Sequence, residues 1–213
     1  MIYVALTATI VGDVAIGKGS SVWHGAVLRG DLDRIVVGQH CSIQDNAVVH
    51  VDKGSPAVIG DRVTIGHAAV VHSCTIASDC IIGMNATLSS RANVGTGSVV
   101  AAGAVVPEDV TFPPNSVIMG IPATRTKDAE DHHRLRVDLS WRMYAELTRN
   151  WRLRPCPRLR TCPETHRSAF GSSWRMRSRG SRGQGPGRIE QDEANARGPW
   201  RQGQDRGSRS PRS

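Results

Sequence analysis

The 213-residue sequence is poor in aromatic residues and has no segment long and apolar enough to cross a membrane. Only two Phe and two Tyr occur, so the interior must be built mainly from Val, Ile, Leu and Ala, which suits a narrow and regular core. The N-terminus also lacks the basic segment and apolar stretch of a secretory signal. We therefore expect a cytoplasmic protein that does not enter a membrane.

Paired cysteines are also lacking. The five cysteines are odd in number, and no two of them form a Cys-x-x-Cys motif. The odd count argues against a disulfide framework, and the missing motif argues against a zinc knuckle built from thiolates.

Basic residues are scarce in the first two thirds of the chain, although the whole sequence carries a net charge of +8. Residues 1–150 have 12 basic and 14 acidic side chains, or −2, whereas residues 151–213 have 15 basic and 5 acidic, or +10. A nucleic-acid-binding body is therefore not indicated. Residues 152–213 are rich in Arg, Gly, Ser and Pro, and we expect a disordered tail. The tail is either a basic arm that binds RNA or an anionic surface, or it is an uninformative extension. We favour the extension.

A period of six residues organises most of the remaining sequence. Neither the 3.6-residue period of a helix nor the alternating strands of a sandwich hold this spacing over six consecutive units. The period fits a coil with three flat sides, in which every sixth side chain points inward and successive coils stack about 4.8 Å apart. We predict an all-β solenoid, a triangular prism of hexapeptide repeats over residues 1–126. The inward positions are Ile16, Val22, Leu28, Val37, Ile43, Val49, Ile59, Ile65, Val71, Ile76, Ile82, Leu88, Val94, Val100 and Val106.

The period changes after the prism. Residues 127–151 place apolar side chains four apart, which predicts a C-terminal amphipathic helix with acidic residues early and Arg149 late, as the helix dipole favours. We expect it to lie along the prism with its apolar stripe covering the outer surface. The stripe consists of Leu135, Leu139, Met143, Leu147 and Trp151.

Two histidines share one phase of the repeat. His50 and His72 each follow an inward residue by one position, as Arg29 does. The intervals from Leu28 to Val49 and on to Val71 are 21 and 22 residues, which is one 18-residue coil plus a loop each time. We therefore expect both histidines on one side of the prism, in successive coils about 5 Å apart, where they can share a tetrahedral metal ion.

A third histidine has a different phase. His67 follows Ile65 by two positions, as Asp45 follows Ile43, with Gln44 beside Asp45. It belongs to the neighbouring side, and one prism cannot easily bring it to the other two histidines. Three prisms around a threefold axis can, because one side of each subunit then faces the neighbouring side of the next. The spacing predicts a homotrimer with metal sites at the subunit boundaries.

Four segments resemble the γ-class carbonic anhydrases and their close relatives, and the similarity extends over residues 1–151. The resemblance implies a left-handed parallel β-helix and a homotrimer with Zn2+ at each interface, Fe2+ or Co2+ being the alternatives. It also implies that His50 and His72 come from one subunit and His67 from its neighbour. The segments are Leu-Arg-Gly-Asp at 28–31, Ile-Gln-Asp-Asn-Ala-Val-Val-His at 43–50, Ile-Gly-His-Ala-Ala-Val-Val-His at 65–72 and Met-Gly-Ile-Pro-Ala at 119–123.

The resemblance further implies roles for other residues. Gln44 would hydrogen-bond the metal-bound water or bicarbonate, and Tyr144 on the C-terminal helix matches a tyrosine near the metal. An interface network would order the site, and its members are Arg29, Asp31 and Asp45. The implied activity is that of a lyase, the reversible hydration of CO2 to bicarbonate by a metal-bound hydroxide.

The chain departs from the best-known active form of this family at two places. That form has an acidic residue directly after the Asp of Arg-x-Asp, where this chain has Leu32, and an acidic loop where this chain has residues 51–56. The usual carboxylates for proton transfer are missing, so the resemblance predicts metal binding but leaves the rate of CO2 hydration open.

Two other functions remain open. A hexapeptide acyltransferase would use acetyl-CoA with one His as general base, and usually adds an acceptor-binding domain, which the sequence lacks. A non-catalytic trimer would use the metal as a structural clip.

Overall fold

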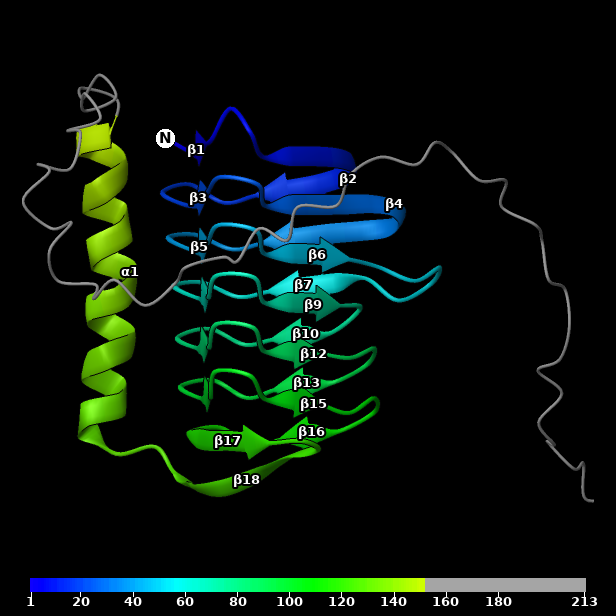
Figure 1. The fold of residues 1–213 in the computed structure, drawn as a ribbon, viewed down its shortest axis with the longest axis vertical. Coiled ribbons are helices and arrows are strands. Elements are labelled where there is room, and N and C mark those ends of the chain that lie inside the picture. The colour runs from blue at the N-terminus through cyan, green and yellow to red at the C-terminus, as the bar shows by residue number, and fades with distance from the viewer. Residues whose placement is uncertain (152–213) are drawn as a thin grey trace, which may run out of the picture. The chain divides into compact units, whose positions relative to one another are not determined.

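The computed structural model describes residues 1–151, which form a parallel β-helix of about six coils followed by one helix (Figure 1). The fold class predicted from the six-residue period is confirmed. The tail predicted for residues 152–213 lies outside the described residues.

The first side of the prism is an eight-stranded sheet. Its strands pair in parallel except for the last pair, which is antiparallel. The strands are β1 (Tyr3–Val4), β3 (Ser21–Val22), β5 (Ser42–Ile43), β8 (Thr64–Ile65), β11 (Ile81–Ile82), β14 (Val99–Val100), β17 (Ser116–Gly120) and β18 (Ala123–Asp128).

A ten-stranded sheet forms the other two sides, because β4 (Val27–Val37) continues around a corner. Its first residues pair with β6 (Val48–His50) and its last residues pair with β7 (Ala57–Ile59). The second side also holds β9 (Val70–His72), β12 (Thr87–Leu88) and β15 (Val105–Val106). The third side also holds β10 (Thr75–Ile76), β13 (Asn93–Val94) and β16 (Thr111–Phe112), and β2 (Thr9–Ile16) pairs with β4.

The inward side chains form three columns, one for each side. On the first side, Val22 pairs with Ile43, Ile43 with Ile65, and Ile65 with Ile82, and all four side chains are fully buried. Every position of the six-residue period from Val22 onward lies in such a column with no more than 2% of its surface exposed. The period therefore exists because each inward side chain contacts the equivalent side chains one coil above and below.

The corner between the first and second sides also repeats. One residue in each coil adopts a left-handed backbone conformation there, and these residues are Gly25, Asn46, Ala68, Asn85 and Gly103. The amide of Ala68 donates to the carbonyl of Asp45, and the amide of Asn85 donates to the carbonyl of His67. Because the corner is tied to the coils above and below it, the side chain of His67 has a fixed starting direction.

Helix α1 (Asp131–Trp151) runs along the first side and contacts β3, β5 and β8 (Figure 1). The prediction that it lies along the prism is correct, and Asp131 and Arg149 occupy its first and last turns as expected from the helix dipole. The helix begins at Asp131, whereas the preceding residues up to Asp128 belong to β18.

The expected packing face of α1 was wrong. Leu135, Leu139 and Met143 are more than half exposed. The helix buries Val137 and packs Tyr144 against the buried Trp23. The buried Ser21, Ser42 and Thr64 supply short polar side chains to the surface beneath it. Ser140 hydrogen-bonds Thr64 at 3.0 Å, so the helix turns a small polar residue toward the sheet. Short side chains let the helix approach closely.

No helix within residues 1–151 combines the length and the apolar character needed to span a membrane.

The columns predict where the chain is sensitive to cavities. Ile82→Ala should lower the free energy of unfolding by about 2–5 kcal/mol, because it removes a side chain enclosed by the coils above and below. Leu6→Ala is the matched control, since Leu6 is fully exposed, and its effect should stay within about 0.5 kcal/mol. Urea denaturation followed by circular dichroism measures both, and equal losses in the two variants would contradict the column packing.

Candidate metal centre

His50 and His72 face each other on the second side of the prism. They are register partners at the ends of β6 and β9, and Arg29 of β4 is the partner of His50 one coil below. The ring centroids are 5.1 Å apart, and Nδ1 of His50 lies 3.1 Å from Nε2 of His72. The sequence prediction that these three residues stack on one side is confirmed.

A carboxylate determines which nitrogen of His50 carries the proton. Nε2 lies 3.2 Å from Oδ1 of Asp31, whose Oδ2 accepts a hydrogen bond of 2.5 Å from Arg29. The Arg29 guanidinium holds the pKa of Asp31 below its usual value, so this carboxylate is ionised and can only accept. Nε2 of His50 must then donate, which leaves the lone pair on Nδ1, toward His72.

Ser90 and Asp52 determine which nitrogen of His72 carries the proton. Nδ1 of His72 lies 3.0 Å from Oγ of Ser90, which donates its own proton to Oδ2 of Asp52 at 2.7 Å. The hydrogen bond from Ser90 lowers the pKa of Asp52, which is therefore an ionised acceptor. Because the hydroxyl has one proton, its oxygen accepts from Nδ1 of His72, and the lone pair of His72 lies on Nε2.

With both rings neutral, the two facing nitrogens are thus both acceptors, and an electropositive centre between them would relieve the repulsion of their lone pairs. Two nitrogens bound to one tetrahedral zinc ion at about 2.0–2.1 Å lie about 3.3 Å from each other, close to the 3.1 Å observed between these two. Carboxylates or hydroxyls behind metal-binding imidazoles are the usual outer partners of such ligands. The donor set therefore fits a divalent metal ion.

His67 lies at the corner between the first and second sides, directly after β8. Its Nδ1 is 2.9 Å from Oδ2 of Asp45, one coil below, as the shared phase predicted. The carboxylate again fixes the proton on one nitrogen and leaves Nε2 as an acceptor. Within residues 1–151 of a single chain, no three His, Cys, Asp or Glu side chains gather into a metal site.

A cleft of about 360 Å3 lies beside His67, between α1 and the first side. Gln44 and Tyr144 line it together with His67, and Gln44 is 5% exposed. The ring of Tyr144 packs edge-on against Trp23 at 5.4 Å. Burial, followed by the charge of Asp45, raises the pKa of the Tyr144 hydroxyl, so it stays protonated at neutral pH.

The predicted site residues therefore fall into two groups. The second-side half-site consists of Arg29, Asp31, His50 and His72. The first-side half-site consists of Gln44, Asp45, His67 and Tyr144. The structure of one chain does not bring the two groups together.

Sequence reasoning missed Ser90 and undervalued Asp52. Ser90 lies one coil above His72 but follows the inward Leu88 by two positions, whereas His72 follows Val71 by one, so the phase that related the histidines would have pointed to Ser89 instead. Asp52 is the one carboxylate of the loop 51–56, where only the lack of an acidic run was noted. Leu32, the other departure from the family pattern, is 53% exposed and contributes no polar group.

A family model described as bacterial transferase hexapeptide (six repeats) matches residues 56–90. A hexapeptide transferase family protein from Anaplasma phagocytophilum is 37% identical, with a TM-score of 0.63 over 70% of this chain and 92% of that one. A probable carbonic anhydrase of Methanocaldococcus jannaschii is 58% identical over 66 residues, or 31% of this chain and 42% of that protein. The chain belongs to the hexapeptide-repeat family, and about a third of it is similar to γ carbonic anhydrases.

Members of this family carry two kinds of name. Gamma carbonic anhydrase 2 of Arabidopsis thaliana, a mitochondrial protein, is 53% identical over 74 residues, or 32% of this chain and 27% of that one. A putative acetyltransferase from Bacillus cereus is 30% identical, with a TM-score of 0.66 over 71% of this chain and 92% of that one. The matches span less than half the length of these curated relatives, whereas they cover nearly all of the two solved structures.

The hydrogen bonds behind His72 predict the effect of Asp52→Asn on its tautomer. The side-chain amide that this substitution introduces can donate to Ser90, which turns the serine proton toward Nδ1 of His72 and moves the ring proton to Nε2. Nitrogen-15 chemical shifts of the histidine rings in metal-free protein measure this exchange.

Asp13→Asn removes an exposed carboxylate elsewhere and is the control, in which His72 should keep its proton on Nδ1. A His72 tautomer that is the same in Asp52→Asn as in the unaltered protein would contradict the assigned hydrogen bonds.

Proposed function

We propose that this chain is a γ-carbonic-anhydrase-like lyase that catalyses the reversible hydration of CO2 to bicarbonate at metal sites shared between the subunits of a homotrimer. The observation that carries the proposal is the pair of acceptor nitrogens on His50 and His72, 3.1 Å apart. The carbonic anhydrase names of the curated relatives support the same activity. We keep the cytoplasm as the expected location.

The two half-sites support assembly. His67 is braced by Asp45 as His50 is braced by Asp31, and its side chain is 44% exposed. His67 resembles a metal ligand because a carboxylate holds one of its ring nitrogens, yet no second metal ligand lies beside it in the described part of its own chain. Another copy of the chain would complete such a site. A threefold arrangement sets the first side of one subunit against the second side of the next, and so joins the two half-sites three times.

The ligands of such a site are all neutral imidazoles. When bound, zinc held by three imidazoles lowers the pKa of a coordinated water to about 7 and so supplies a nucleophile for CO2, with Fe2+ or Co2+ as the alternatives on the same nitrogens. Asp31, Asp45 and the Ser90–Asp52 pair fix the tautomers that such ligands need.

The cleft beside His67 suits the reactant and the product. Apolar CO2 matches its small and apolar lining, which includes Met84, Ala101 and Ala102. The buried amide of Gln44 would hydrogen-bond an oxygen of bicarbonate and so orient it, and the protonated hydroxyl of Tyr144 can donate a second hydrogen bond. Arg29 acts through Asp31, whose carboxylate it holds in place behind His50.

Acetyl transfer is the second candidate function. It is favoured by the likeness to the putative acetyltransferase from Bacillus cereus, which this chain matches over most of its length. It would need one His as a general base and no metal. A non-catalytic trimer held by a metal clip is the third, and the loss of the usual proton-transfer carboxylates favours it over rapid catalysis.

Metal content separates these functions. The purified full-length protein should contain about one divalent ion per chain, and the single variants His50→Ala, His67→Ala and His72→Ala should each lose it. When chains of His50→Ala and His67→Ala are unfolded and refolded together in equal amounts, about one quarter of the sites should recover metal, one half times one half, because each site draws on two chains.

The control is to refold each variant alone, and no site should then recover metal. Mixed trimers that remain free of metal would contradict shared ligands, and a metal-free protein that acetylates an acceptor would favour the second candidate.

Proton removal should limit the rate of CO2 hydration, because Leu32 cannot accept a proton. Stopped-flow measurements should give a kcat that rises with buffer concentration. At low buffer, Leu32→Glu should raise kcat by about tenfold or more, since a positioned carboxylate replaces the buffer. Leu6→Glu adds the same charge at a fully exposed position elsewhere and should leave kcat unchanged. No measurable CO2 hydration by metal-loaded protein at any buffer concentration would favour the structural clip.

A further inference from the structure

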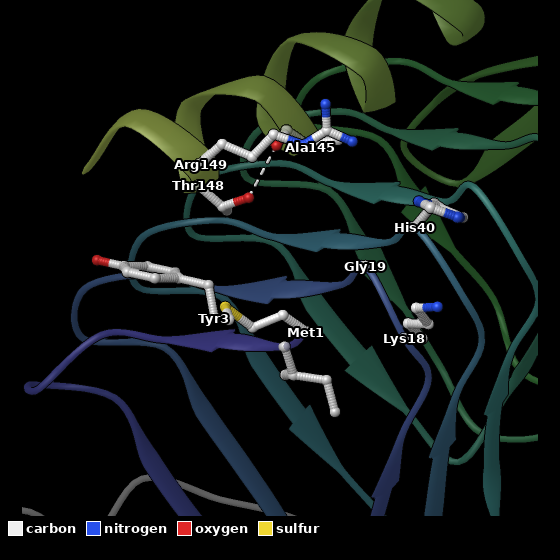
Figure 2. A pocket seen from close by; sticks show the side chains of 9 residues that line it. Met1, Tyr3, Lys18, Gly19, His40, Ala145, Thr148 and Arg149 are labelled. Carbon is white, nitrogen blue, oxygen red and sulfur yellow. Dashed lines mark hydrogen bonds between the residues drawn. The ribbon is translucent and has the colours of Figure 1, made fainter. Parts of the chain in front are cut away.

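A second cavity lies at the opposite edge of the first side from His67. Its volume is about 450 Å3, and Figure 2 shows it between the first coils and the last turns of α1. Lys18 and His40 line it from the turns that precede β3 and β5, whereas His67 follows β8. Helix α1 lines both cavities, but no residue lines the two of them.

The polar part of the lining is basic. Lys18, His40 and Arg149 line the cavity, and among residues 1–151 no acidic side chain does, although Glu146 lines an adjoining pocket with His40 and Arg149. Neither Lys18 nor Arg149 forms an ion pair with another residue in the described part of the chain, in contrast to Arg62 and Arg91, whose carboxylate partners are 2.6 Å away. In Figure 2, Lys18 and His40 lie at one edge of the cavity, and Arg149 lies above them on α1. An anionic group would find cationic donors along this lining.

His40 is held in position although Nδ1 has no hydrogen-bond partner. This nitrogen is buried and unpaired among the described residues. A Cβ on Gly19 would lie 2.5 Å from it, so only glycine at position 19 lets the ring sit against the turn. On the other side the ring centroid is 5.5 Å from that of Trp141 on α1. A buried polar atom without a partner is uncommon, because it loses the free energy of a hydrogen bond.

The remainder of the lining is apolar. Met1 and Ile2 contribute side chains that are 78% and 37% exposed, and the ring of Tyr3 and the Cβ of Ala145 add to them. Cavities of about this size with an apolar wall and a few convergent polar groups are typical of small-molecule sites.

We propose that this cavity binds an anionic amphiphile of the fatty-carboxylate class. The carboxylate would contact Lys18, His40 and Arg149, and the apolar body would cover Met1, Ile2 and Tyr3. Two permanent cations and one imidazole match a singly charged head that can accept several hydrogen bonds, and the exposed apolar residues would be covered at the same time. The site does not depend on the metal or on the proposed lyase activity.

Octanoate is the probe that tests this site. The full-length protein is labelled with carbon-13 at its methionine methyl groups and titrated with octanoate, and the Met1 signal should shift with saturation. Met84 and Met143 line the cleft beside His67, so their signals report on the wrong site and should stay in place. Octanol has the same apolar body without the charge, and should bind at least about tenfold more weakly.

Variants test the cationic side chains and the open volume of the cavity separately. The double variant Lys18→Gln, Arg149→Gln should weaken octanoate at least about tenfold, because the carboxylate loses its two charged donors. Arg34→Gln removes an exposed cation that also lacks an ion pair in the described chain, and should leave binding unchanged. Ala145→Phe fills the cavity from the helix and should abolish binding while the circular dichroism spectrum is preserved.

Four results would overturn the proposal. They are a Met1 signal that does not saturate, shifts at Met84 or Met143 instead, equal affinity for octanol, and unchanged octanoate binding in the double variant or in Ala145→Phe.

Discussion

Backbone hydrogen bonding between successive coils is the constraint on which the rest of the structure depends. It fixes the register of every strand on its neighbour, so a residue in one coil always lies above the same residue in the coil below. The column of inward Val, Ile and Leu side chains follows from that register, and so does the stacking of His50 on His72. A single error of register on the second side would separate these two rings and remove the facing nitrogens.

The prism and the positions of the histidines could be predicted from the sequence because both are periodic. Each residue's side and coil follow from counting back to the nearest inward residue, even across the loops after Leu28 and Val49. The structure confirms the pairing of His50 with His72 and of Asp45 with His67. Counting could not reveal that Asp52, from a loop that leaves the repeat, reaches Ser90 and fixes the tautomer of His72.

The packing face of α1 could not be predicted because apolar spacing was a misleading guide there. The stripe that begins at Leu135 is the more regular pattern in the sequence, yet Leu135, Leu139 and Met143 are more than half exposed. The face that packs on the prism is another one: it includes Val137, which is buried, and Tyr144, whose ring contacts Trp23, beside the hydrogen bond between Ser140 and Thr64.

The incomplete half-sites link the fold to the proposed chemistry. Each histidine has one nitrogen occupied by a partner in its own chain, and the corner between the first and second sides keeps His67 away from His50 and His72. A flat-sided prism cannot bring together three side chains that lie on two of its sides. Its rigid faces let identical prisms pack so that side chains from two copies meet. In this account the interface and the metal site form together.

The most direct test is anomalous diffraction at the zinc absorption edge from crystals of the full-length protein grown with zinc. The account predicts one peak per chain, about 2.0–2.1 Å from Nδ1 of His50 and Nε2 of His72 in one copy and from Nε2 of His67 in another. A peak bound by His50 and His72 with the His67 of every copy remote from it would contradict the shared centre.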